Sequence, residues 1–395
     1  MRVGIFGGSF NPIHNGHLMI AKNAISAAKL DKCLLVVANN PPHKHVDYNV
    51  PAQVRFDMSC TALSDTKDLP IYACNVEIIN NLCYTCDMLS VLSQTNDFKD
   101  AEIYLIIGAD MLNSFLTWRN PEKICSLIKG IIAVKRSNEI PEYDFEKSYE
   151  IITKTLGIDI IIINDVSNIS STAIRDAVIN FEPISNMVPY ETERFIYENG
   201  LYTNDYIRFI INDLRKSLGQ KRFSHSVSTM RESILLADRY GADKQICAIA
   251  GLVHDCAKIT GVDYLDLCEQ YGIEADEYEK KSPALLHAKL GVYKAQTVYG
   301  IKDTRILNAI INHTVGAPCL DLISKIVYVA DKIEVLREYP EAKQMRKTAY
   351  EDIDKAALET MNFNIDKLRM AEKPVHPATI NAIEYYQNVC GGNKQ

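Results

Sequence analysis

The sequence predicts an α/β domain built on a parallel sheet, followed by an all-α domain. The chain has 395 residues, and a domain usually has roughly 100–200 residues, so two domains are expected. Up to about residue 200, short β-branched apolar runs alternate with stretches of helical periodicity, which is typical of a parallel sheet with helices on both faces. Beyond that point the β-branched runs disappear and amphipathic helical patterns dominate. We place the boundary near Thr203, which gives domains over residues 1–202 and 203–395.

The individual elements follow from the apolar patterns. Five short apolar runs are predicted as buried strands, over residues 2–6, 33–38, 103–107, 130–134 and 158–163. Apolar side chains at steps of three and four predict helices between the first three strands, over residues 17–29 and 54–63. The same periodicity predicts a bundle in the second domain, with helices over residues 206–218, 226–240, 245–254, 286–299, 306–313 and 322–336.

Composition excludes several classes of protein. A hydrophobic content of 47% and a charged content of 24% are ordinary globular values. The formal net charge of -7 argues against nucleic-acid binding by broad backbone neutralisation. Eleven scattered cysteines suggest free thiols in a reducing cytosol, with a redox pair at Cys83 and Cys86 as the alternative. We find no signal-peptide pattern and no apolar run of the ~18 residues that a membrane span needs, so we expect a soluble, cytoplasmic protein without membrane contact.

A glycine-rich segment follows the first predicted strand. Gly7 and Gly8 leave room for a phosphate-bearing ligand to approach the backbone. His14 and His17 flank Gly16 at the start of the next predicted helix, where the helix dipole and unpaired N–H groups favour anions. Two imidazoles beside a phosphate are able to donate hydrogen bonds to charge that grows in a transition state.

This segment resembles the G-G-[ST]-F-[DN]-P-x-H-x-G-H signature of the Rossmann-like nucleotidyltransferases, with Asn11 where Asp is commoner. The further matches are Pro41-Pro42-His43-Lys44, Arg55, Met58, Ile107-Gly108-Ala109-Asp110-Met111-Leu112, Trp118, Ile169-Ser170-Ser171-Thr172-Ala173-Ile174-Arg175, Val188-Pro189 and Asn199-Gly200-Leu201-Tyr202. Together they make residues 1–202 similar to the bacterial nicotinate-nucleotide adenylyltransferases.

The resemblance implies transfer of AMP from ATP to nicotinate mononucleotide, giving deamido-NAD and pyrophosphate, with Mg²⁺ held mainly by substrate oxygens. Its implied catalytic residues are His14, His17, Lys44 and Arg175, with His17 stabilising the transition state. The implied substrate- and nucleotide-binding residues are Gly7, Gly8, Ser9, Phe10, Tyr84, Thr85, Gly108, Asp110, Trp118, Ile169, Ser170, Ser171 and Thr172.

Two of these assignments have a structural alternative, and a third bears on the cysteine pair. Trp118 is the only tryptophan, and a single Trp is more often a core packer, although the family places an aromatic ring near the nicotinate. Asp110 either binds ribose hydroxyls or caps a turn. The match at Tyr84 and Thr85, where the family's backbone meets the nicotinate carboxylate, explains the nearby cysteine pair without redox chemistry.

The second half carries histidines and aspartates on several predicted helices. These are His225, His254, Asp255, His287, His313 and Asp331. Such side chains are able to converge on a divalent metal in the core of a bundle. The adjacent His254 and Asp255 are unusual as packing residues, because a buried Asp needs a charged partner or a metal.

This H…HD…D pattern is similar to the HD-domain metal-dependent phosphohydrolases, and His287 and His313 resemble the branch that holds two metals, often iron. The segments His254-Asp255-Cys256-Ala257-Lys258, Leu285-Leu286-His287-Ala288, Asn312-His313-Thr314-Val315-Gly316 and Tyr328-Val329-Ala330-Asp331-Lys332-Ile333-Glu334 resemble the symmetrical diadenosine-tetraphosphate hydrolases over residues 205–390. The resemblance implies two metals that activate water for attack on phosphorus. It also implies a leaving-phosphate role for Lys258, one turn after Asp255 on the same helix, with weaker phosphate candidates at Arg222, Thr314 and Arg337.

We therefore expect a bifunctional enzyme that acts on small molecules: ATP, nicotinate mononucleotide and diadenosine tetraphosphate. The alternatives are another adenylyl or cytidylyl acceptor for the first domain, and another phosphohydrolase substrate or a non-catalytic nucleotide-sensing role for the second. A homo-oligomer is compatible with either.

Overall fold

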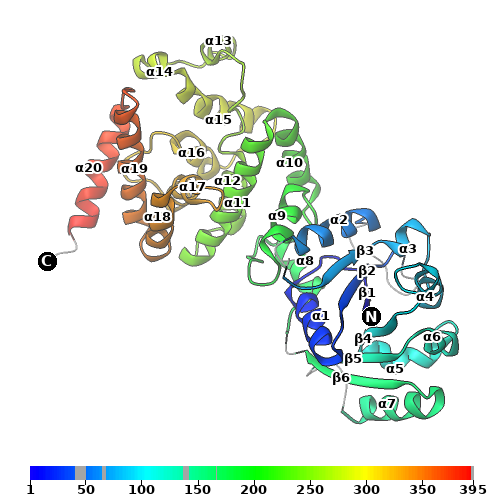
Figure 1. The fold of residues 1–395 in the computed structure, drawn as a ribbon. Coiled ribbons are helices and arrows are strands. Elements are labelled where there is room, and N and C mark those ends of the chain that lie inside the picture. The colour runs from blue at the N-terminus through cyan, green and yellow to red at the C-terminus, as the bar shows by residue number, and fades with distance from the viewer. Residues whose placement is uncertain (41–49, 65–67, 137–141, 166, 393–395) are drawn as a thin grey trace. The chain divides into compact units, whose positions relative to one another are not determined.

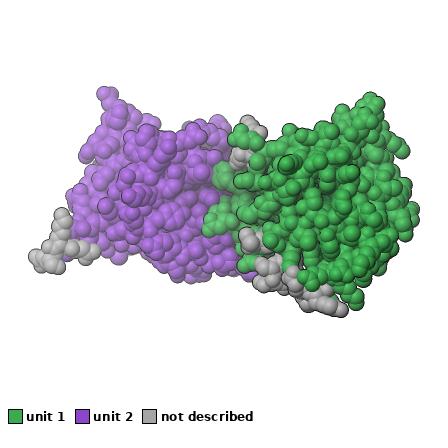
Figure 2. Space-filling view, turned by 60° about the horizontal axis from the view of Figure 1, so that its bottom comes forward, with its two compact units in different colours: residues 1–176, 184–196 green, residues 177–183, 197–395 purple. Residues whose placement is uncertain are grey.

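The computed structural model describes residues 1–40, 50–64, 68–136, 142–165 and 167–392. Contacts within the chain divide it into two units, which Figure 2 distinguishes by colour. Unit 1 contains residues 1–176 and 184–196, and unit 2 contains residues 177–183 and 197–395. Among the described residues, no helix combines the length and apolar character needed to cross a membrane.

Unit 1 is built on a six-stranded parallel sheet with the order β3-β2-β1-β4-β5-β6 (Figure 1). The strands are β1 (Arg2–Gly8), β2 (Lys32–Val37), β3 (Ile71–Cys74), β4 (Glu102–Gly108), β5 (Gly130–Arg136) and β6 (Asp159–Asp165). Strands β2 and β3 lie on one side of β1, and strands β4, β5 and β6 lie on its other side. Ligands of such sheets bind at the carboxyl ends of the strands where the order reverses, which here is the end of β1.

The helices of unit 1 connect these strands. They are α1 (Asn15–Ala28), α2 (Ala52–Leu63), α3 (Val76–Ile79), α4 (Thr85–Gln94), α5 (Ala109–Ser114), the 3-10 turn η2 (Phe115–Thr117), α6 (Pro121–Leu127), α7 (Glu142–Leu156), α8 (Ser171–Ile179) and α9 (Tyr190–Glu198), the last two of which run past the bounds of unit 1. Alternate strand positions such as Ile5, Leu105 and Ile131 share one buried cluster with Leu89 of α4 and Leu112 of α5. Burial on both faces explains why the strands read as continuous apolar runs.

The α/β fold of the first half is confirmed, with two differences in detail. Strand β3 was not predicted: it has four residues at the edge of the sheet, and only Ile71 is buried in it. Gly7 and Gly8 are the last residues of β1 rather than residues after it, because pairing with Val36 and Val37 continues to that point.

Unit 2 is helical, as predicted. Its elements are α10 (Asp205–Ser217), α11 (Gln220–Tyr240), α12 (Lys244–Val253), α13 (Tyr264–Gln270), α14 (Glu277–Lys281), η3 (Pro283–Leu286), α15 (His287–Thr297), α16 (Thr304–Asn312), α17 (Leu322–Ile333), α18 (Pro340–Glu351), α19 (Ile353–Met370) and α20 (Pro377–Gly391). Helix α11 begins six residues before the predicted start at 226, with Gly219 in the N-cap position.

Helices α11 and α12 approach closely at Gly251. A Cβ atom at this position would lie 2.6 Å from the Ser233 hydroxyl and 3.0 Å from the Thr229 carbonyl oxygen. Only glycine allows this separation. The contact matters for the site because α11 carries His225, and His254 directly follows the end of α12.

Candidate active sites

The two histidines of the N-terminal motif lie against each other at the start of α1. The His14 and His17 rings stack with their centroids 3.6 Å apart. The backbone N–H of His14 donates to Nδ1 of His17 at 3.3 Å. Because Nδ1 of His17 accepts, the proton of a neutral ring is on Nε2, where it is able to donate to a ligand. His14 is buried, and the Phe10 ring packs edge-on against His17 at 5.0 Å.

Gly16 is required between the two histidines. A Cβ atom there would meet the Ser167 hydroxyl at 2.6 Å and Nδ1 of His14 at 3.0 Å. The α1 start is also tied down by Asn15, whose backbone N–H donates to the Met187 carbonyl at 2.9 Å. The spacing H-x-G-H therefore fits a tightly packed corner at the start of α1.

The start of α8 is fastened to the segment that follows β1. The Ser171 hydroxyl donates to the Pro12 carbonyl at 2.9 Å, and the Arg175 guanidinium donates to the Asn11 carbonyl at 2.9 Å. Ser170 accepts from the Ala173 N–H at 3.1 Å, which caps the helix. The structure thus brings together predicted residues that are 160 positions apart in the chain.

A second guanidinium braces the same segment. Arg55 on α2 is buried, and it donates to the carbonyls of Ser9 at 2.5 Å, Ala38 at 2.7 Å and Asn39 at 3.0 Å. It therefore joins the ends of β1 and β2. Sequence reasoning matched Arg55 to the family but gave it no role, because its burial and its carbonyl partners are visible only in the folded chain.

The other predicted residues of unit 1 lie along β4 and α4. Arg119 stands over the Tyr84 ring at 4.6 Å and pairs with Asp87 at 3.5 Å, which joins the start of α4 to the residue next to Trp118. Trp118 is half-buried against the sheet core, with its ring 5.2 Å from that of Phe115. Both of its alternatives, packing and ligand contact, are compatible with this position.

Asp110 is exposed at the end of β4. Its Oδ1 atom lies 2.5 Å from the place that a Cβ atom at Gly108 would take, so a larger residue at 108 would force this exposed carboxylate to move. Cys83 and Cys86 are free thiols, and burial raises the pKa of Cys86. Lys44 lies outside the described residues.

The six predicted metal ligands of unit 2 converge in one buried cluster. All six are at most 6% exposed. His225 Nε2 lies 2.9 Å from Asp331 Oδ1, and Asp255 Oδ1 lies 3.0 Å from His287 Nε2 and 3.1 Å from His313 Nε2. His254 Nε2 lies between the two aspartates, 3.5 Å from Asp255 and 3.7 Å from Asp331.

All four imidazoles direct Nε2 into the cluster. Nδ1 of His254, His287 and His313 faces the carbonyl oxygen three residues earlier, at Gly251, Ala284 and Ile310. Nδ1 of His225 faces Glu334 at 3.0 Å. An acceptor at each Nδ1 keeps the proton there, which leaves a lone pair on every Nε2.

This arrangement fits divalent metal ions. His287 and His313 Nε2 lie 3.0 Å apart, and burial, the largest effect, lowers the pKa of both rings, so two lone pairs face each other. Nε2 of His254 is buried and has no hydrogen-bond partner among the described residues. Two overlapping groups, His225–His254–Asp331 and His254–Asp255–His313, have ligand atoms close enough for one ion each.

Basic side chains surround the cluster. Arg222 contacts Asp255 at 2.6 Å, Lys258 contacts it at 3.4 Å, and Lys332 and Arg337 contact Asp331. Burial alone would raise the pKa of Asp255, but His254 first, and then His287 and His313, hold it well below its usual range. Lys258 was expected on a helix with Asp255; instead both lie in the turn after α12, which ends at Val253, and the Lys258 N–H donates to the Asp255 carbonyl at 2.9 Å.

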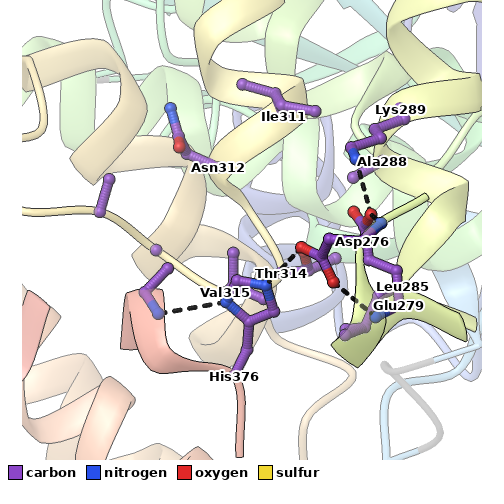
Figure 3. A pocket seen from close by; sticks show the side chains of 13 residues that line it. Asp276, Glu279, Leu285, Ala288, Lys289, Ile311, Asn312, Thr314, Val315 and His376 are labelled. Atoms are coloured by element: carbon purple, nitrogen blue, oxygen red, sulfur yellow. Dashed lines mark hydrogen bonds and ion pairs between the residues drawn. The ribbon is translucent and has the colours of Figure 1, made fainter. Parts of the chain in front are cut away.

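A pocket of about 250 Å³ lies beside the segments that carry His287 and His313 (Figure 3). Its walls are mostly apolar and include Leu285, Ile311 and Val315. At its edge His376, in the N-cap position of α20, contacts Asp276 at 3.0 Å, and Lys289 contacts Glu279 at 2.6 Å, as the dashed lines in Figure 3 show. Sequence reasoning gave His376 no role.

The parallel sheet with its glycine-rich loop, and the helical cluster of histidines and aspartates, define an enzyme with a nucleotidyltransferase-type domain and an HD-type domain. The cytidylyltransferase-like family matches residues 5–177, and the HD domain matches residues 222–336. By its first domain, the chain belongs to the nicotinate-nucleotide adenylyltransferase family, and it carries an HD domain in its second half.

Three relatives illustrate the similarity. A protein of Mycoplasma genitalium named "Probable nicotinate-nucleotide adenylyltransferase/Ap4A hydrolase" is 28% identical over 91% of this chain and 96% of its own length. A "Probable nicotinate-nucleotide adenylyltransferase" of Borreliella burgdorferi is 31% identical over 51% of this chain and 97% of its own length. A crystal structure of a predicted HD superfamily hydrolase involved in NAD metabolism from Clostridium acetobutylicum is 37% identical, covers 46% of this chain and 96% of its own, and has a TM-score of 0.44.

Proposed function

We propose that residues 1–202 transfer AMP from ATP to nicotinate mononucleotide, giving deamido-NAD and pyrophosphate. The observation that carries this proposal is the stacked His14–His17 pair at the carboxyl end of β1, next to the braced start of α8. The names of the relatives that match this half of the chain support the choice of acceptor.

In this reaction an oxygen of the mononucleotide phosphate attacks the α-phosphorus of ATP, and the bond to pyrophosphate breaks on the opposite side. The ATP phosphates lie along Gly7, Gly8, Ser9 and Phe10 and against the N-terminal N–H groups of α8. Nε2–H of His17 donates to the phosphate oxygen on which charge grows, and His14 holds the His17 ring in place. Mg²⁺ bound to phosphate oxygens neutralises part of their charge.

The remaining residues have different tasks. Arg175 and Ser171 hold the segment after β1, so they position the phosphates largely through the backbone. Ile169, Ser170 and Thr172 offer hydroxyl and backbone groups to the β and γ phosphates, Lys44 adds a cation, and the mononucleotide is held by Tyr84, Thr85, Gly108, Asp110 and Trp118.

The test is an acceptor comparison with purified protein. Pyrophosphate release with ATP is measured with nicotinate mononucleotide, nicotinamide mononucleotide and pantetheine phosphate in turn. We expect the nicotinate form to give the highest kcat/KM. Turnover of pantetheine phosphate without turnover of either mononucleotide contradicts the assignment.

We further propose that residues 203–395 hydrolyse diadenosine tetraphosphate to two ADP with two divalent metals, in the cell iron. The observation that carries this proposal is the convergence of four Nε2 lone pairs and two carboxylates in one buried cluster. The ligands are His225, His254, Asp255, His287, His313 and Asp331, with His254 common to the two groups of ligand atoms that lie close enough to hold an ion. When bound, the metals activate water and neutralise phosphate oxygens.

The chain's own cations complete this site. Lys258 lies 34% exposed at its edge and points an ammonium group toward Asp255, where it is able to meet the phosphate of the leaving ADP. Arg222 and Arg337 are 34% and 31% exposed and are placed to hold the other phosphates.

This half is tested with protein loaded anaerobically with iron and given diadenosine tetraphosphate, with products separated by chromatography. We expect ADP alone, and no ADP from the His254→Ala variant. Formation of ATP and AMP means that the cleavage position is wrong. No turnover, together with altered adenylyltransferase kinetics in His254→Ala, favours the nucleotide-sensing alternative.

A further inference from the structure

Glu334 is a buried carboxylate that touches the metal cluster without being one of its predicted ligands. Its side chain is 1% exposed. Oε1 lies 3.0 Å from Nδ1 of His225, and Oε2 accepts a hydrogen bond from the Leu336 N–H at 2.7 Å. Both oxygens are therefore engaged, and the carboxylate is held from two sides.

His225 differs in this respect from the other three histidines. Nδ1 of His254, His287 and His313 faces a neutral backbone carbonyl. His225 is the only one of the four whose Nδ1 atom faces a carboxylate. A carboxylate on Nδ1–H makes Nε2 a stronger metal ligand than a carbonyl does, because negative charge is shared with the ring through the hydrogen bond.

Glu334 also opposes a local positive charge. The Arg337 guanidinium approaches Nε2 of His225 at 3.3 Å and Asp331 at 3.0 Å, which disfavours a cation at that place. Oε1 of Glu334 lies 3.5 Å from Nε of the same guanidinium. Its negative charge partly cancels the effect of Arg337 on an ion held by His225.

We propose that Glu334 is a positioning residue for one metal position only: it fixes and strengthens His225, and thereby the ion shared by His225, His254 and Asp331. The position formed by His254, Asp255 and His313 does not depend on it. This inference rests on the proposed two-metal centre.

The test separates the two positions by mutation. Metal-free protein is titrated with Co²⁺, and binding is followed by equilibrium dialysis and by the visible absorption of the bound ion. His313→Ala leaves the His225 position, and His225→Ala leaves the other. Adding Glu334→Gln to His313→Ala is expected to raise the remaining Kd by ~10–100-fold and to change the absorption spectrum. Adding it to His225→Ala is expected to change the Kd by less than about threefold, the scatter usual for a measured Kd.

Glu232→Gln is the matched control. Glu232 is a similarly buried carboxylate on α11 that contacts the Tyr350 hydroxyl at 3.0 Å and Arg231 at 3.8 Å, and neither of these residues is a predicted metal ligand. We expect it to leave both Kd values unchanged. Equal weakening in both backgrounds by Glu334→Gln, or weakening in neither, overturns the inference. If the protein without any substitution does not bind two equivalents of Co²⁺, the two-metal centre itself is overturned.

Discussion

The contact of α11 with α12 at Gly251 predicts a defined cost for one methyl group. In Gly251→Ala the new Cβ would lie 2.6 Å from the Ser233 hydroxyl, 3.0 Å from the Thr229 carbonyl and 3.1 Å from the Met230 Cα. Two of these three atoms are backbone, so a side-chain rotation does not relieve them. The two helices have to separate by several tenths of an ångström.

The magnitude follows from two opposing effects. Overpacking of a tight core costs ~1–3 kcal/mol, and contacts this short belong at the upper end. Alanine regains about 1 kcal/mol over glycine in a helix. The net loss is therefore about 2 kcal/mol, which lowers Tm by about 4–8 °C for a domain of this size.

The assay uses the position of the only tryptophan. Trp118 lies in unit 1, so its fluorescence follows the unfolding of that unit, whereas far-UV circular dichroism follows both. In Gly251→Ala we expect circular dichroism to show a lower unfolding temperature for unit 2. The unfolding temperature of unit 1, followed by tryptophan fluorescence, is expected to stay unchanged. Adding Ser233→Ala removes the shortest contact and is expected to restore about half of the loss. An unchanged or higher Tm in Gly251→Ala refutes the reasoning, because alanine's helix propensity would then outweigh the packing.

Three other changes test the two halves separately. His17→Ala is expected to lower adenylyltransferase kcat by ~10²-fold with little change in ATP affinity measured by calorimetry; an unchanged kcat removes its transition-state role. Arg55→Met leaves the Ser9 carbonyl and its neighbours without a charged donor and is expected to cost about 3 kcal/mol, seen as a lower transition in tryptophan fluorescence; a transition at the usual temperature contradicts this. The Glu279 N–H and then His376 lower the pKa of Asp276 from 3.8 to about 2, so its contribution to stability is present above pH ~4 and is lost as the pH falls toward 2. Denaturant titrations should therefore show a lower free energy of unfolding for Asp276→Asn than for the unsubstituted protein at pH 6, and no difference near pH 2. A difference that persists near pH 2 contradicts this prediction.

Much of the fold was predictable because burial on both faces leaves a plain signal. Strands β1, β2, β4 and β5 are continuous apolar runs whose residues are mostly buried. Strand β6 is also a continuous apolar run, although it lies at the edge of the sheet and its Ile162 is 47% exposed. Strand β3 has one buried residue among four, so its run is too short to stand out. Helices α13, α14, α18, α19 and α20 were not predicted. Helices α13 and α14 have seven and five residues, less than two full turns of clear periodicity. In α18 and α20 only four of twelve and four of fifteen residues are buried, so the apolar face is narrow.

The candidate sites were predictable where residue type and spacing are both unusual. Adjacent His254 and Asp255 met both conditions, and the structure places them in the cluster. Arg55 and Glu334 did not: an Arg on an amphipathic helix and a Glu after an apolar one are ordinary on a solvent-exposed face. Their importance depends on burial and on partners 46 and 109 residues away, Ser9 and His225, which only the folded chain brings close.

The cluster of unit 2 also has a consequence for how long the protein lasts in a cell. Four lone pairs and two carboxylates occupy space that a helical bundle normally fills with aliphatic side chains. An ion that binds only the folded form stabilises it by mass action, by about 2.7 kcal/mol when its free concentration is 100 times Kd. Metal-depleted protein is therefore expected to unfold more often in this half of the chain and to be cut there by proteases more readily.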